Sequence, residues 1–312
     1  MEYIGAEKIE KLVSVGDVIQ TIEDYYLNDG EKDSFLPERL FINDDQNTTI
    51  LMPSFYKNYY AAKVVGIAPE NAKIGEPTLR GVIILYKREN MKPLLMLDAR
   101  TITAIRTGSI SGVGMKYMAK DNASTVGVIG TGDQGWSHFQ AACAVRPIKT
   151  ALINNRSPER LEKFIEKAQK KFPDITFKSA SQVEVLKQSE LIITTSTSVD
   201  PVLPEIEGID LSGKHFAGAG AFKPNMQEIP DYIIKNADHV AVDSYAAFDE
   251  CKEMSFARSI GYTKDNIMDA KKLVLNGEKE SIKNGVTIFK SVGVSILDVL
   301  ASRLVYEKLN VK

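Results

Sequence analysis

A glycine-rich turn between an apolar strand and a helix constrains the fold of this chain more than any other feature. The turn has the pattern G-x-G-x-x-G and directly follows the apolar run 126–129. In such a turn the first glycine permits the sharp bend, the second lets the backbone approach a pyrophosphate, and the third lets the helix pack near the strand. Because the N-terminus of the next helix favours negative charge, the segment predicts a dinucleotide site rather than a glycine-rich turn without a ligand. The predicted contacts are Gly130, Thr131, Gly132, Asp133, Gln134 and Gly135.

From residue 124 onward the order strand, turn, helix repeats. This alternation predicts a parallel sheet with helices on both faces, because parallel strands need crossover connections. We therefore predict a Rossmann domain over residues 121–294, with Asp121 and Asn122 as the hinge that leads into it. The predicted strands are 126–129, 150–153, 191–194, 214–217 and 239–243, and the predicted helices are 136–145 and 158–172.

The region before residue 120 differs, because several strand-like runs follow one another without helices between them. Such runs predict a largely antiparallel sheet. The predicted fold class is thus α/β, a Rossmann domain plus an α+β domain of residues 1–120 with 295–312. The predicted strands are 48–52, which Pro53 is expected to end, 61–68, and a hairpin of 81–86 with 93–97. The predicted helices are 14–27, 103–118 and 294–309, and Ser109, Gly112 and Gly114 indicate close packing of the second one.

Composition excludes several classes of function. The 312 residues are 44% hydrophobic and 26% charged, with a formal net charge of -2, so no strong field attracts nucleic acid or an anionic membrane. The apolar runs are too short to span a bilayer, and the first eight residues lack the basic and then apolar pattern of a signal peptide. Cys143 and Cys251 lie too far apart in sequence to suggest a metal site. We expect reduced thiols, no metal and a cytoplasmic protein.

The end of the second Rossmann strand indicates which dinucleotide binds. An enzyme that uses NAD usually has Asp or Glu there, which binds the ribose 2′-hydroxyl, whereas this chain has Asn154, Asn155, Arg156 and Ser157. Because a guanidinium binds phosphate through two hydrogen bonds, Arg156 and Ser157 favour NADPH, with NADH as the second choice. The alternatives are a solvated arginine and a serine that only caps the next helix. The predicted cofactor contacts therefore also include Asn155, Arg156 and Ser157. Thr195, Ser196, Val292 and Gly293 are predicted as further cofactor contacts.

Four segments, in one consistent order, resemble the ornithine cyclodeaminase/mu-crystallin family. They are Lys63-Val64-Val65, the run L-D-A-R-T-I-T-A-I-R-T-G over 97–108, the glycine-rich turn, and Phe289-Lys290-Ser291-Val292-Gly293. The family includes cyclodeaminases, alanine dehydrogenases, ketimine and pyrroline-carboxylate reductases and opine-type synthases, so the resemblance implies fold and cofactor more narrowly than substrate. It also implies a substrate and dimerisation domain made of the N-terminal half and the last helix. The resemblance also implies a homodimer that forms through the N-terminal sheets. It further implies a site in the cleft between the domains.

The resemblance further implies that two arginines and a lysine bind the substrate carboxylate. The matching positions are Arg39, which follows Pro37 and Glu38, together with Lys63 and Arg106. Their chemistry agrees, because a carboxylate that leaves water needs charged hydrogen-bond donors. Lys63 lies in an apolar strand, where an unpaired lysine is costly, and Arg106 lies on a helix of small and apolar residues. The alternatives are a Lys63 that reaches solvent and an Arg106 that bridges domains.

One position departs from the family pattern. In true ornithine cyclodeaminases an aspartate follows the glycines after the fifth Rossmann strand and transfers protons at the substrate amine, whereas this chain has Phe222. A phenyl ring accepts no proton, so deaminative cyclisation is disfavoured. The next carboxylate, Glu228, is equally consistent with a structural role. His138, His215 and Asp298 are also expected to be structural.

Three functions remain open at this point. The first is an NADPH-dependent reductase of a small α-imino acid, such as pyrroline-2-carboxylate or another ketimine, or the related amino-acid or opine dehydrogenase. The second is an ornithine cyclodeaminase with another base, and the third is a protein that binds NADPH and a ligand without turnover. We predict the first, in which Arg39 and Arg106 fix the carboxylate while Lys63 holds it or protonates the nitrogen.

Overall fold

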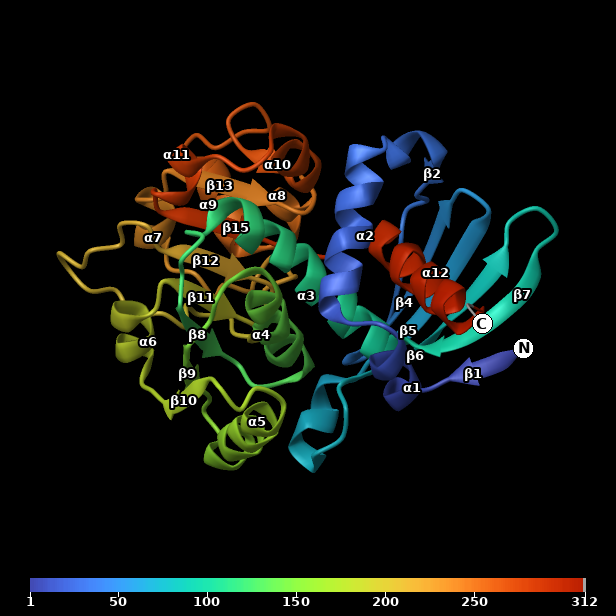
Figure 1. The fold of residues 1–312 in the computed structure, drawn as a ribbon, viewed down its shortest axis with the longest axis horizontal. Coiled ribbons are helices and arrows are strands. Elements are labelled where there is room, and N and C mark those ends of the chain that lie inside the picture. The colour runs from blue at the N-terminus through green and yellow to red at the C-terminus, as the bar shows by residue number, and fades with distance from the viewer. Residues whose placement is uncertain (311–312) are drawn as a thin grey trace. The chain divides into compact units, whose positions relative to one another are not determined.

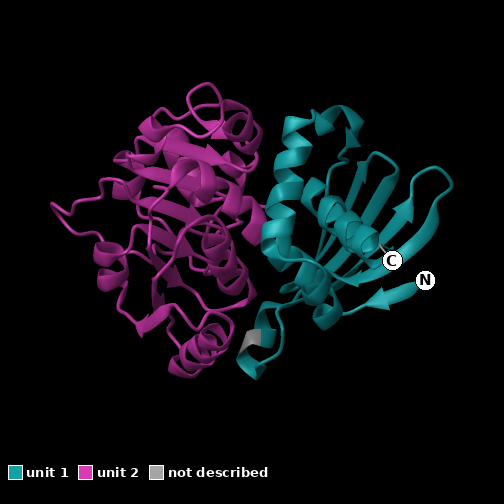
Figure 2. Cartoon of the chain, viewed as in Figure 1, with its two compact units in different colours: residues 1–106, 294–312 teal, residues 107–293 magenta. Residues whose placement is uncertain are grey.

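The computed structural model describes residues 1–310, apart from the side chain of Ala72. The chain folds as two compact units, which Figure 2 colours separately. Unit 1 comprises residues 1–106 and 294–312, and unit 2 comprises residues 107–293. Within the described part of the chain, no helix combines the length and the apolar character needed to cross a membrane.

Unit 2 is built on a sheet of eight parallel strands, as the alternating pattern predicts (Figure 1). Its strands are β8 (Thr125–Ile129), β9 (Thr150–Asn154), β10 (Thr176–Ser179), β11 (Leu191–Thr194), β12 (His215–Gly218), β13 (His239–Val242), β14 (Met268–Asp269) and β15 (Thr287–Lys290). They lie in the order β10-β9-β8-β11-β12-β15-β13-β14. The chain runs outward from β8 to β10 and then returns to place β11 on the other side of β8. Dinucleotides bind at such a topological switch point, beyond the carboxyl ends of the strands.

The predicted Rossmann strands are confirmed with small shifts at their ends, while β10, β14 and β15 were not predicted. β10 is a mostly exposed edge strand, and β15 is only four residues long and ends in a lysine, so neither shows the expected apolar run. All four residues of β15 are nevertheless buried, because it lies between β12 and β13. The helices of unit 2 are α4 (Asp133–Val145), α5 (Pro158–Lys171), α6 (Gln182–Gln188), α7 (Asp231–Lys235), α8 (Ala247–Glu250), α9 (Lys252–Ser259), α10 (Ala270–Asn276) and α11 (Glu280–Lys283).

Unit 1 contains the predicted, largely antiparallel sheet. Its strands are β1 (Glu2–Ile4), β2 (Ser34–Phe35), β3 (Leu40–Asp44), β4 (Asn47–Tyr56), β5 (Tyr59–Ile67), β6 (Leu79–Lys87) and β7 (Lys92–Asp98). The order is β1-β7-β6-β5-β4-β2, with β3 also paired to β4, and only the β1–β7 pair is parallel. The predicted hairpin is confirmed as β6 and β7.

The prediction that Pro53 ends its strand is wrong, because β4 continues through it to Tyr56. Proline cannot donate a backbone hydrogen bond, so it is tolerated only where no neighbouring strand needs one. On one side of β4 the pairing with β5 is continuous, and Pro53 lies opposite Ala62. On the other side of β4, the pairing with β3 extends as far as Leu51 and the pairing with β2 begins at Phe55. Pro53 therefore lies in the gap between β3 and β2.

One face of the unit 1 sheet is covered by α12 (Ile296–Asn310), which packs on β4, β5 and β6 and against α2 (Val15–Leu27), as Figure 1 shows. Ser14 and Asp17 form a capping box at the start of α2, which satisfies backbone donors that a helix otherwise leaves free. The remaining elements of unit 1 are α1 (Ala6–Leu12) and the 3-10 helices η1 (Gly30–Asp33) and η2 (Pro69–Ile74).

Helix α3 (Ala99–Met118) begins earlier than the predicted residue 103. Asp98, at the end of β7, explains the early start. Its Oδ1 accepts hydrogen bonds from the Thr101 backbone N–H at 2.7 Å and from the Thr101 hydroxyl at 2.6 Å, which is the geometry of a helix N-cap.

The division between the units falls inside α3, at 106/107, whereas the sequence predicts it at 120/121. The small residues of α3 account for this difference. A Cβ on Gly108 would lie 2.2 Å from Oγ of Ser137 on α4, and a Cβ on Gly114 would lie 2.3 Å from Cγ of Phe289 on β15. The second part of α3 therefore packs directly on the elements of unit 2.

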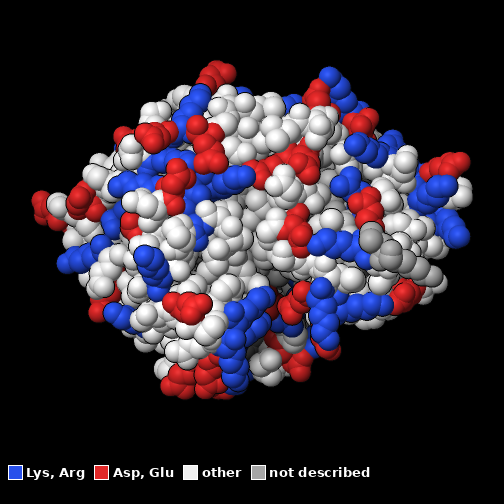
Figure 3. Space-filling model, in the orientation of Figure 1, with Lys and Arg blue, Asp and Glu red and all other residues white. Residues whose placement is uncertain are grey.

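Charges of both signs are interspersed on the face of the molecule that Figure 3 shows. Neither the lysines and arginines nor the acidic residues form one continuous patch on this face. This distribution agrees with a formal net charge of -2.

Candidate functional site

A buried cluster of three charged side chains lies in unit 1. Nζ of Lys63, on β5, is 2.6 Å from Oδ2 of Asp298, on α12. Nε of Arg106, on α3, donates a hydrogen bond to Oδ1 of Asp298 at 3.1 Å. Only 2% of Lys63 and 5% of Arg106 are exposed, and Asp298 is fully buried. The structure therefore brings together two of the three predicted catalytic residues and joins them through one carboxylate.

The strand pattern explains why Lys63 points inward. Ala61, Lys63 and Val65 alternate with more exposed residues along β5, so they share the face that α12 covers. Met52 on β4 and Ile83 on β6 lie directly opposite Lys63 in the neighbouring strands, and both are buried. The side chain of Lys63 thus has apolar neighbours in both adjacent strands, and Asp298 is the ion-pair partner of its ammonium group.

Two cations share one carboxylate in this cluster, so it carries an excess of positive charge. Nη1 of Arg106 is buried and has no hydrogen-bond partner among the described residues. A buried donor without a partner is costly, and a carboxylate ligand would satisfy it. The cluster is therefore suited to bind a small anion.

Burial lowers the pKa of Lys63 to about 8, even though Asp298 favours the charged form. The positive charges of Arg106 and Arg39 lower it further. A lysine with this pKa is still mostly protonated at neutral pH but releases its proton far more readily than a surface lysine. Such a group can serve as a general acid.

Arg39 is the third predicted catalytic residue. It precedes β3 directly and is half-buried, with its guanidinium carbon 5.3 Å from the centre of the Phe41 ring. Its influence on the pKa of Lys63 indicates that its charge acts on the cluster. Asp298 was expected to be only structural, although one signal pointed to more: it is a lone acid within the buried apolar run 296–300.

The glycine-rich turn of unit 2 has the geometry that each glycine position requires. Gly130 has a φ of +102°, which favours glycine. A Cβ on Gly135 would lie 1.9 Å from the carbonyl oxygen of Gly130, so the close packing of helix on strand needs glycine there. At Gly132, by contrast, no described atom beyond its neighbours in the chain lies within 4 Å of an added Cβ. This open space, beside the uncapped N-terminus of α4, fits the pyrophosphate of a dinucleotide.

The predicted 2′-phosphate residues lie at the end of β9. Asn155 ties this segment to the glycine-rich turn, because its Nδ2 donates to Oγ1 of Thr131 and its Oδ1 accepts from the backbone N–H of Ser157. The Ser157 hydroxyl accepts a hydrogen bond from the backbone N–H of Arg160 and so caps α5. In this structure Ser157 therefore acts as a helix cap, which was the alternative to a contact with the 2′-phosphate. Arg156 is exposed.

Glu228 is fully buried and holds two loops at the carboxyl ends of β11 and β12. Its Oε1 accepts a hydrogen bond from the backbone N–H of Ser196, and its Oε2 accepts from Gly220 at 2.6 Å and Ala221 at 3.2 Å. Thr195, in the same loop as Ser196, donates through its hydroxyl to the Gly130 carbonyl at 3.2 Å. Glu228 therefore positions the backbone beside the glycine-rich turn.

A buried lysine and a second acid support Glu228. Nζ of Lys290 lies 2.8 Å from Oε2 of Glu253 and 3.9 Å from Oε2 of Glu228. Oε1 of Glu253 accepts from the backbone N–H groups of Glu228 and Ile229. Burial alone would lower the pKa of Lys290, but the charges of Glu253 and Glu228 raise that pKa above its ordinary value. Both oxygens of Glu228 accept backbone hydrogen bonds, which agrees with a structural role, and burial raises the pKa of its carboxyl group.

The predicted contacts Val292 and Gly293 lie in a turn that Asp243 holds. Oδ2 of Asp243 accepts hydrogen bonds from the Ser291 hydroxyl and the Gly293 backbone N–H, both at 2.7 Å, and the Val292 N–H lies 3.1 Å from each oxygen. Asp243 follows β13 and the turn follows β15, the neighbouring strand. Sequence reasoning missed Asp243, although it ends a predicted strand.

His138 and His215 are both buried in unit 2, in surroundings that agree with the structural role expected for them. Nδ1 of His138 donates to the Gln134 carbonyl at 2.7 Å, and the Ser111 hydroxyl lies 2.9 Å from Nε2. Burial lowers the pKa of His138 to about 4 and that of His215 to about 3. Both rings are therefore neutral at physiological pH and are not proton donors to a substrate.

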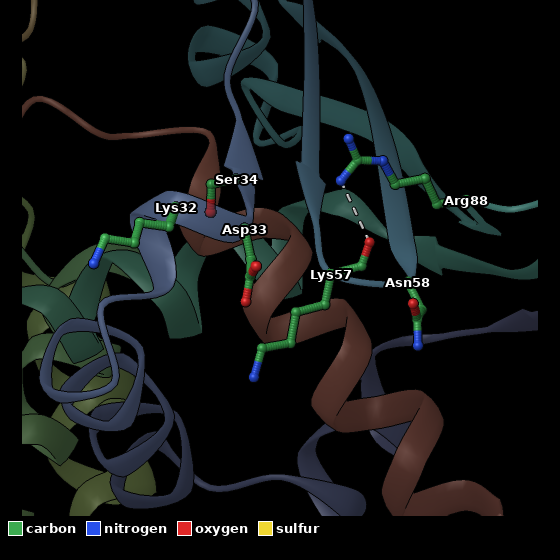
Figure 4. A pocket seen from close by; sticks show the side chains of 6 residues that line it. All are labelled: Lys32, Asp33, Ser34, Lys57, Asn58 and Arg88. Atoms are coloured by element: carbon green, nitrogen blue, oxygen red, sulfur yellow. Dashed lines mark hydrogen bonds between the residues drawn. The ribbon is translucent and has the colours of Figure 1, made fainter.

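A separate polar pocket of unit 1 takes no part in this site. Arg88 Nη1 donates to the Lys57 carbonyl at 3.4 Å, and Figure 4 shows that the cationic ends of the long side chains do not converge on one point. None of the predicted catalytic or cofactor-binding residues lines it. The lining residues are Lys32, Asp33, Ser34, Lys57, Asn58 and Arg88.

This chain is similar to several known proteins over nearly its whole length. A Delta(1)-pyrroline-2-carboxylate reductase from Bacillus cereus is 33% identical over 316 residues, which cover 99% of this chain and 96% of that protein. The solved structure of the Thermococcus litoralis Delta(1)-pyrroline-2-carboxylate reductase in complex with NADH and L-proline is 29% identical, with a TM-score of 0.88 and coverage of 99% and 97%. An archaeal alanine dehydrogenase dimer with bound NAD is 26% identical, with a TM-score of 0.86 and coverage of 98% and 95%. The sequence pattern of the ornithine cyclodeaminase/mu-crystallin family matches residues 5–312, and the chain belongs to this family.

Proposed function

We propose that this protein is an NAD(P)H-dependent reductase that converts a small cyclic α-imino acid, such as pyrroline-2-carboxylate, to the amino acid. The observation that carries the proposal is the buried cluster of Lys63, Arg106 and Asp298, which has excess positive charge and an unsatisfied guanidinium donor. The relatives named for Delta(1)-pyrroline-2-carboxylate reduction, one of them solved with NADH and L-proline, support this choice of substrate class.

Each cation of the cluster has a role in this reaction. Arg106, with Arg39, binds the substrate carboxylate, which fixes the orientation of the prochiral carbon. When bound, the reduced nicotinamide supplies the hydride that the C=N carbon accepts. Lys63 gives a proton to the imine nitrogen, so that the C=N bond becomes a C–N bond and an N–H bond. A pKa of about 8 suits Lys63 to this transfer near neutral pH.

The dinucleotide is proposed to bind unit 2 at the switch point between β8 and β11. Gly132 and the N-terminus of α4 would hold the pyrophosphate, since both are open to a ligand. Thr195, Ser196, Val292 and Gly293 would contact the rest of the cofactor, on the loops that Glu228 and Asp243 hold. The two solved relatives described above contain NADH or NAD, so the preference for NADPH rests on Arg156 and on the missing acid at the end of β9.

A cyclodeaminase is the weaker candidate for this chain. That reaction needs a carboxylate to move protons at the substrate amine. Phe222 stands at the position of the family aspartate, and the next acid, Glu228, already accepts backbone hydrogen bonds on both oxygens. A reductase needs no such base, because its substrate already contains C=N.

We also propose a cytoplasmic homodimer. Leu40, Phe41 and Ile42 on β3 are each about half exposed, at 53%, 49% and 48%. An exposed apolar strand of this kind favours pairing with another chain, and the alanine dehydrogenase relative is a dimer. The free thiols of Cys143 and Cys251 suit a reducing compartment.

The reaction itself is the first prediction. We expect the protein to oxidise NADPH or NADH in the presence of pyrroline-2-carboxylate at roughly 1 per second or faster, and to release no significant ammonia from L-ornithine with NAD or NADP. Arg106→Ala should lose on the order of 2–5 kcal/mol in kcat/KM while it still binds NADPH, because the substrate carboxylate is left unpaired. Absorbance at the nicotinamide band and parallel assays of proline and ammonia measure these outcomes. Stoichiometric proline and ammonia from ornithine would contradict the proposal.

The glycine-rich turn gives a second prediction with its own control. Gly132→Val should weaken NADPH binding by tenfold or more, roughly 1.4 kcal/mol, because the side chain enters the space proposed for the pyrophosphate. Its free energy of unfolding without cofactor should change little, since no described atom beyond its chain neighbours lies within 4 Å of the added Cβ. Gly135→Ala should instead lower the free energy of unfolding, because its Cβ collides with the Gly130 carbonyl. Calorimetric titration and urea unfolding separate the two effects, and a destabilised Gly132→Val would argue against the assignment.

Cofactor choice is the third prediction. Wild-type protein should bind NADPH more tightly than NADH, and Arg156→Ala should narrow the difference by about 1–3 kcal/mol, the usual value of a charged hydrogen bond. Arg160→Ala, an equally exposed arginine on the first turn of α5, is the matched control and should leave the difference unchanged. Calorimetric titration of both cofactors tests this, and equal affinities in the wild type would show that Arg156 does not select the phosphate.

The dimer is the fourth prediction. Ile42→Asp should shift the mass measured by light scattering from twice the chain mass to the chain mass of 34.5 kDa, because a buried, unpaired carboxylate would destabilise an interface through β3. Ile74→Asp changes an isoleucine that is 73% exposed on η2 and should leave the mass unchanged. A wild-type protein that is monomeric at micromolar concentration would rule the interface out.

A further inference from the structure

We propose that Asp298 is a positioning residue, which holds Lys63 in its protonated form and fixes Arg106 by one edge so that the rest of its guanidinium is left for the substrate. The inference rests on the proposed function, because it assigns Lys63 the proton transfer and Arg106 the carboxylate. It adds a residue that touches neither substrate nor cofactor in that proposal.

The geometry divides the carboxylate between the two cations. Oδ2 lies 2.6 Å from Nζ of Lys63, and Oδ1 accepts the hydrogen bond from Nε of Arg106 at 3.1 Å. Asp298 is fully buried on α12, between the buried apolar residues Leu297 and Val299. An ionised carboxylate in such a place is stable only when cations compensate it, so its two contacts and its charge depend on each other.

Asp298 favours the ammonium form of Lys63, both through its charge and through its hydrogen bond. Burial favours the neutral amine most strongly, and the positive charges of Arg106 on α3 and Arg39 before β3 act in the same direction. The facing residues of the neighbouring strands, Met52 and Ile83, carry no charge. Without Asp298, burial and the charges of the two arginines would lower the pKa of Lys63 further below its present value of about 8. Lys63 would then be largely neutral at pH 7 and could not donate the proton.

The same contact determines which donors of Arg106 are free for a ligand. Nε is bound by Asp298, while Nη1 is buried without a hydrogen-bond partner among the described residues. A guanidinium is planar, so one bound edge restricts the orientation of the whole group. A substrate carboxylate would complete the set of hydrogen bonds that Asp298 leaves open.

The test is the pH dependence of pyrroline-2-carboxylate reduction in Asp298→Asn. The protonated form of Lys63 is the active one, so kcat/KM falls as pH rises through its pKa. Loss of the Asp298 charge should move this alkaline limb to lower pH by about 1–3 units, the usual effect of one opposite charge at this distance. Ser302→Ala is the matched control, because Ser302 lies one turn further along α12 and is also fully buried. It should leave the limb in place, and titration of the substrate itself affects all variants equally.

A direct titration of Lys63 separates this inference from the proposed function. In protein labelled with 13C-lysine, with the Lys63 signal identified by its loss in Lys63→Met, the Cε shift reports the ammonium without any turnover. Asp298→Asn should lower the pKa of Lys63, whereas Arg106→Gln should raise it, because the repulsion is lost and the carboxylate is no longer shared. Arg106→Gln keeps the neutral Lys63–Asp298 pair, so it provides the test even if Asp298→Asn does not fold.

The outcomes are distinct. A wild-type protein without imine reductase activity would overturn the proposed function, while the titration would still decide whether Asp298 controls Lys63. An unchanged alkaline limb in Asp298→Asn, or a Lys63 pKa that does not respond to Arg106→Gln, would overturn the role of Asp298. Opposite shifts in the two variants, with Ser302→Ala unchanged, would support it.

Discussion

Charged side chains that leave water must find compensating charges or hydrogen bonds, and this requirement shapes both units of the protein. In unit 1 a single carboxylate, Asp298, compensates Lys63 and Arg106, and positive charge remains in excess. In unit 2 two carboxylates, Glu228 and Glu253, surround one ammonium group, that of Lys290. The excess positive charge of the first cluster suits an anionic ligand, whereas the carboxylates of the second accept hydrogen bonds from the backbone of their own chain.

The second cluster gives unit 2 its fixed loops. The carboxyl ends of parallel strands expose backbone N–H groups in the loops that follow, and these groups need acceptors. Glu228 accepts from the loops after β11 and β12, and Asp243 accepts from the turn after β15. The loop after β11 lies beside the glycine-rich turn, because β11 is the neighbour of β8, and β12 and β15 follow β11 in the sheet. Buried acids therefore hold the backbone around the proposed dinucleotide site.

The cluster in unit 1 suits the chemistry that we propose for it. A site that binds a carboxylate and gives a proton needs one permanent cation and one cation that releases its proton near neutral pH. Arginine provides the first, because its guanidinium remains charged. Burial and neighbouring positive charge convert Lys63 into the second by lowering its pKa to about 8. The same physical cost that makes a buried lysine rare therefore makes this one useful.

Local patterns in the sequence were sufficient for the Rossmann unit, the glycine-rich turn and the antiparallel sheet. Each of these depends on short-range rules, namely glycines at fixed spacing and alternation along a strand. The candidates Lys63 and Arg106 came from the resemblance to the family, supported by the cost of burying a charge. Tertiary structure decided what those rules cannot reach. Strand β4 continues through Pro53 because β3 and β2, which pair with the same side of β4, leave a gap opposite this proline. The division between the units lies inside α3 because Gly108 and Gly114 pack closely on elements of unit 2. The tertiary structure also joined Asp298 to a lysine and an arginine far away in the chain. The partner of a buried charge depends on which segments pack together, and no spacing within one segment encodes that choice.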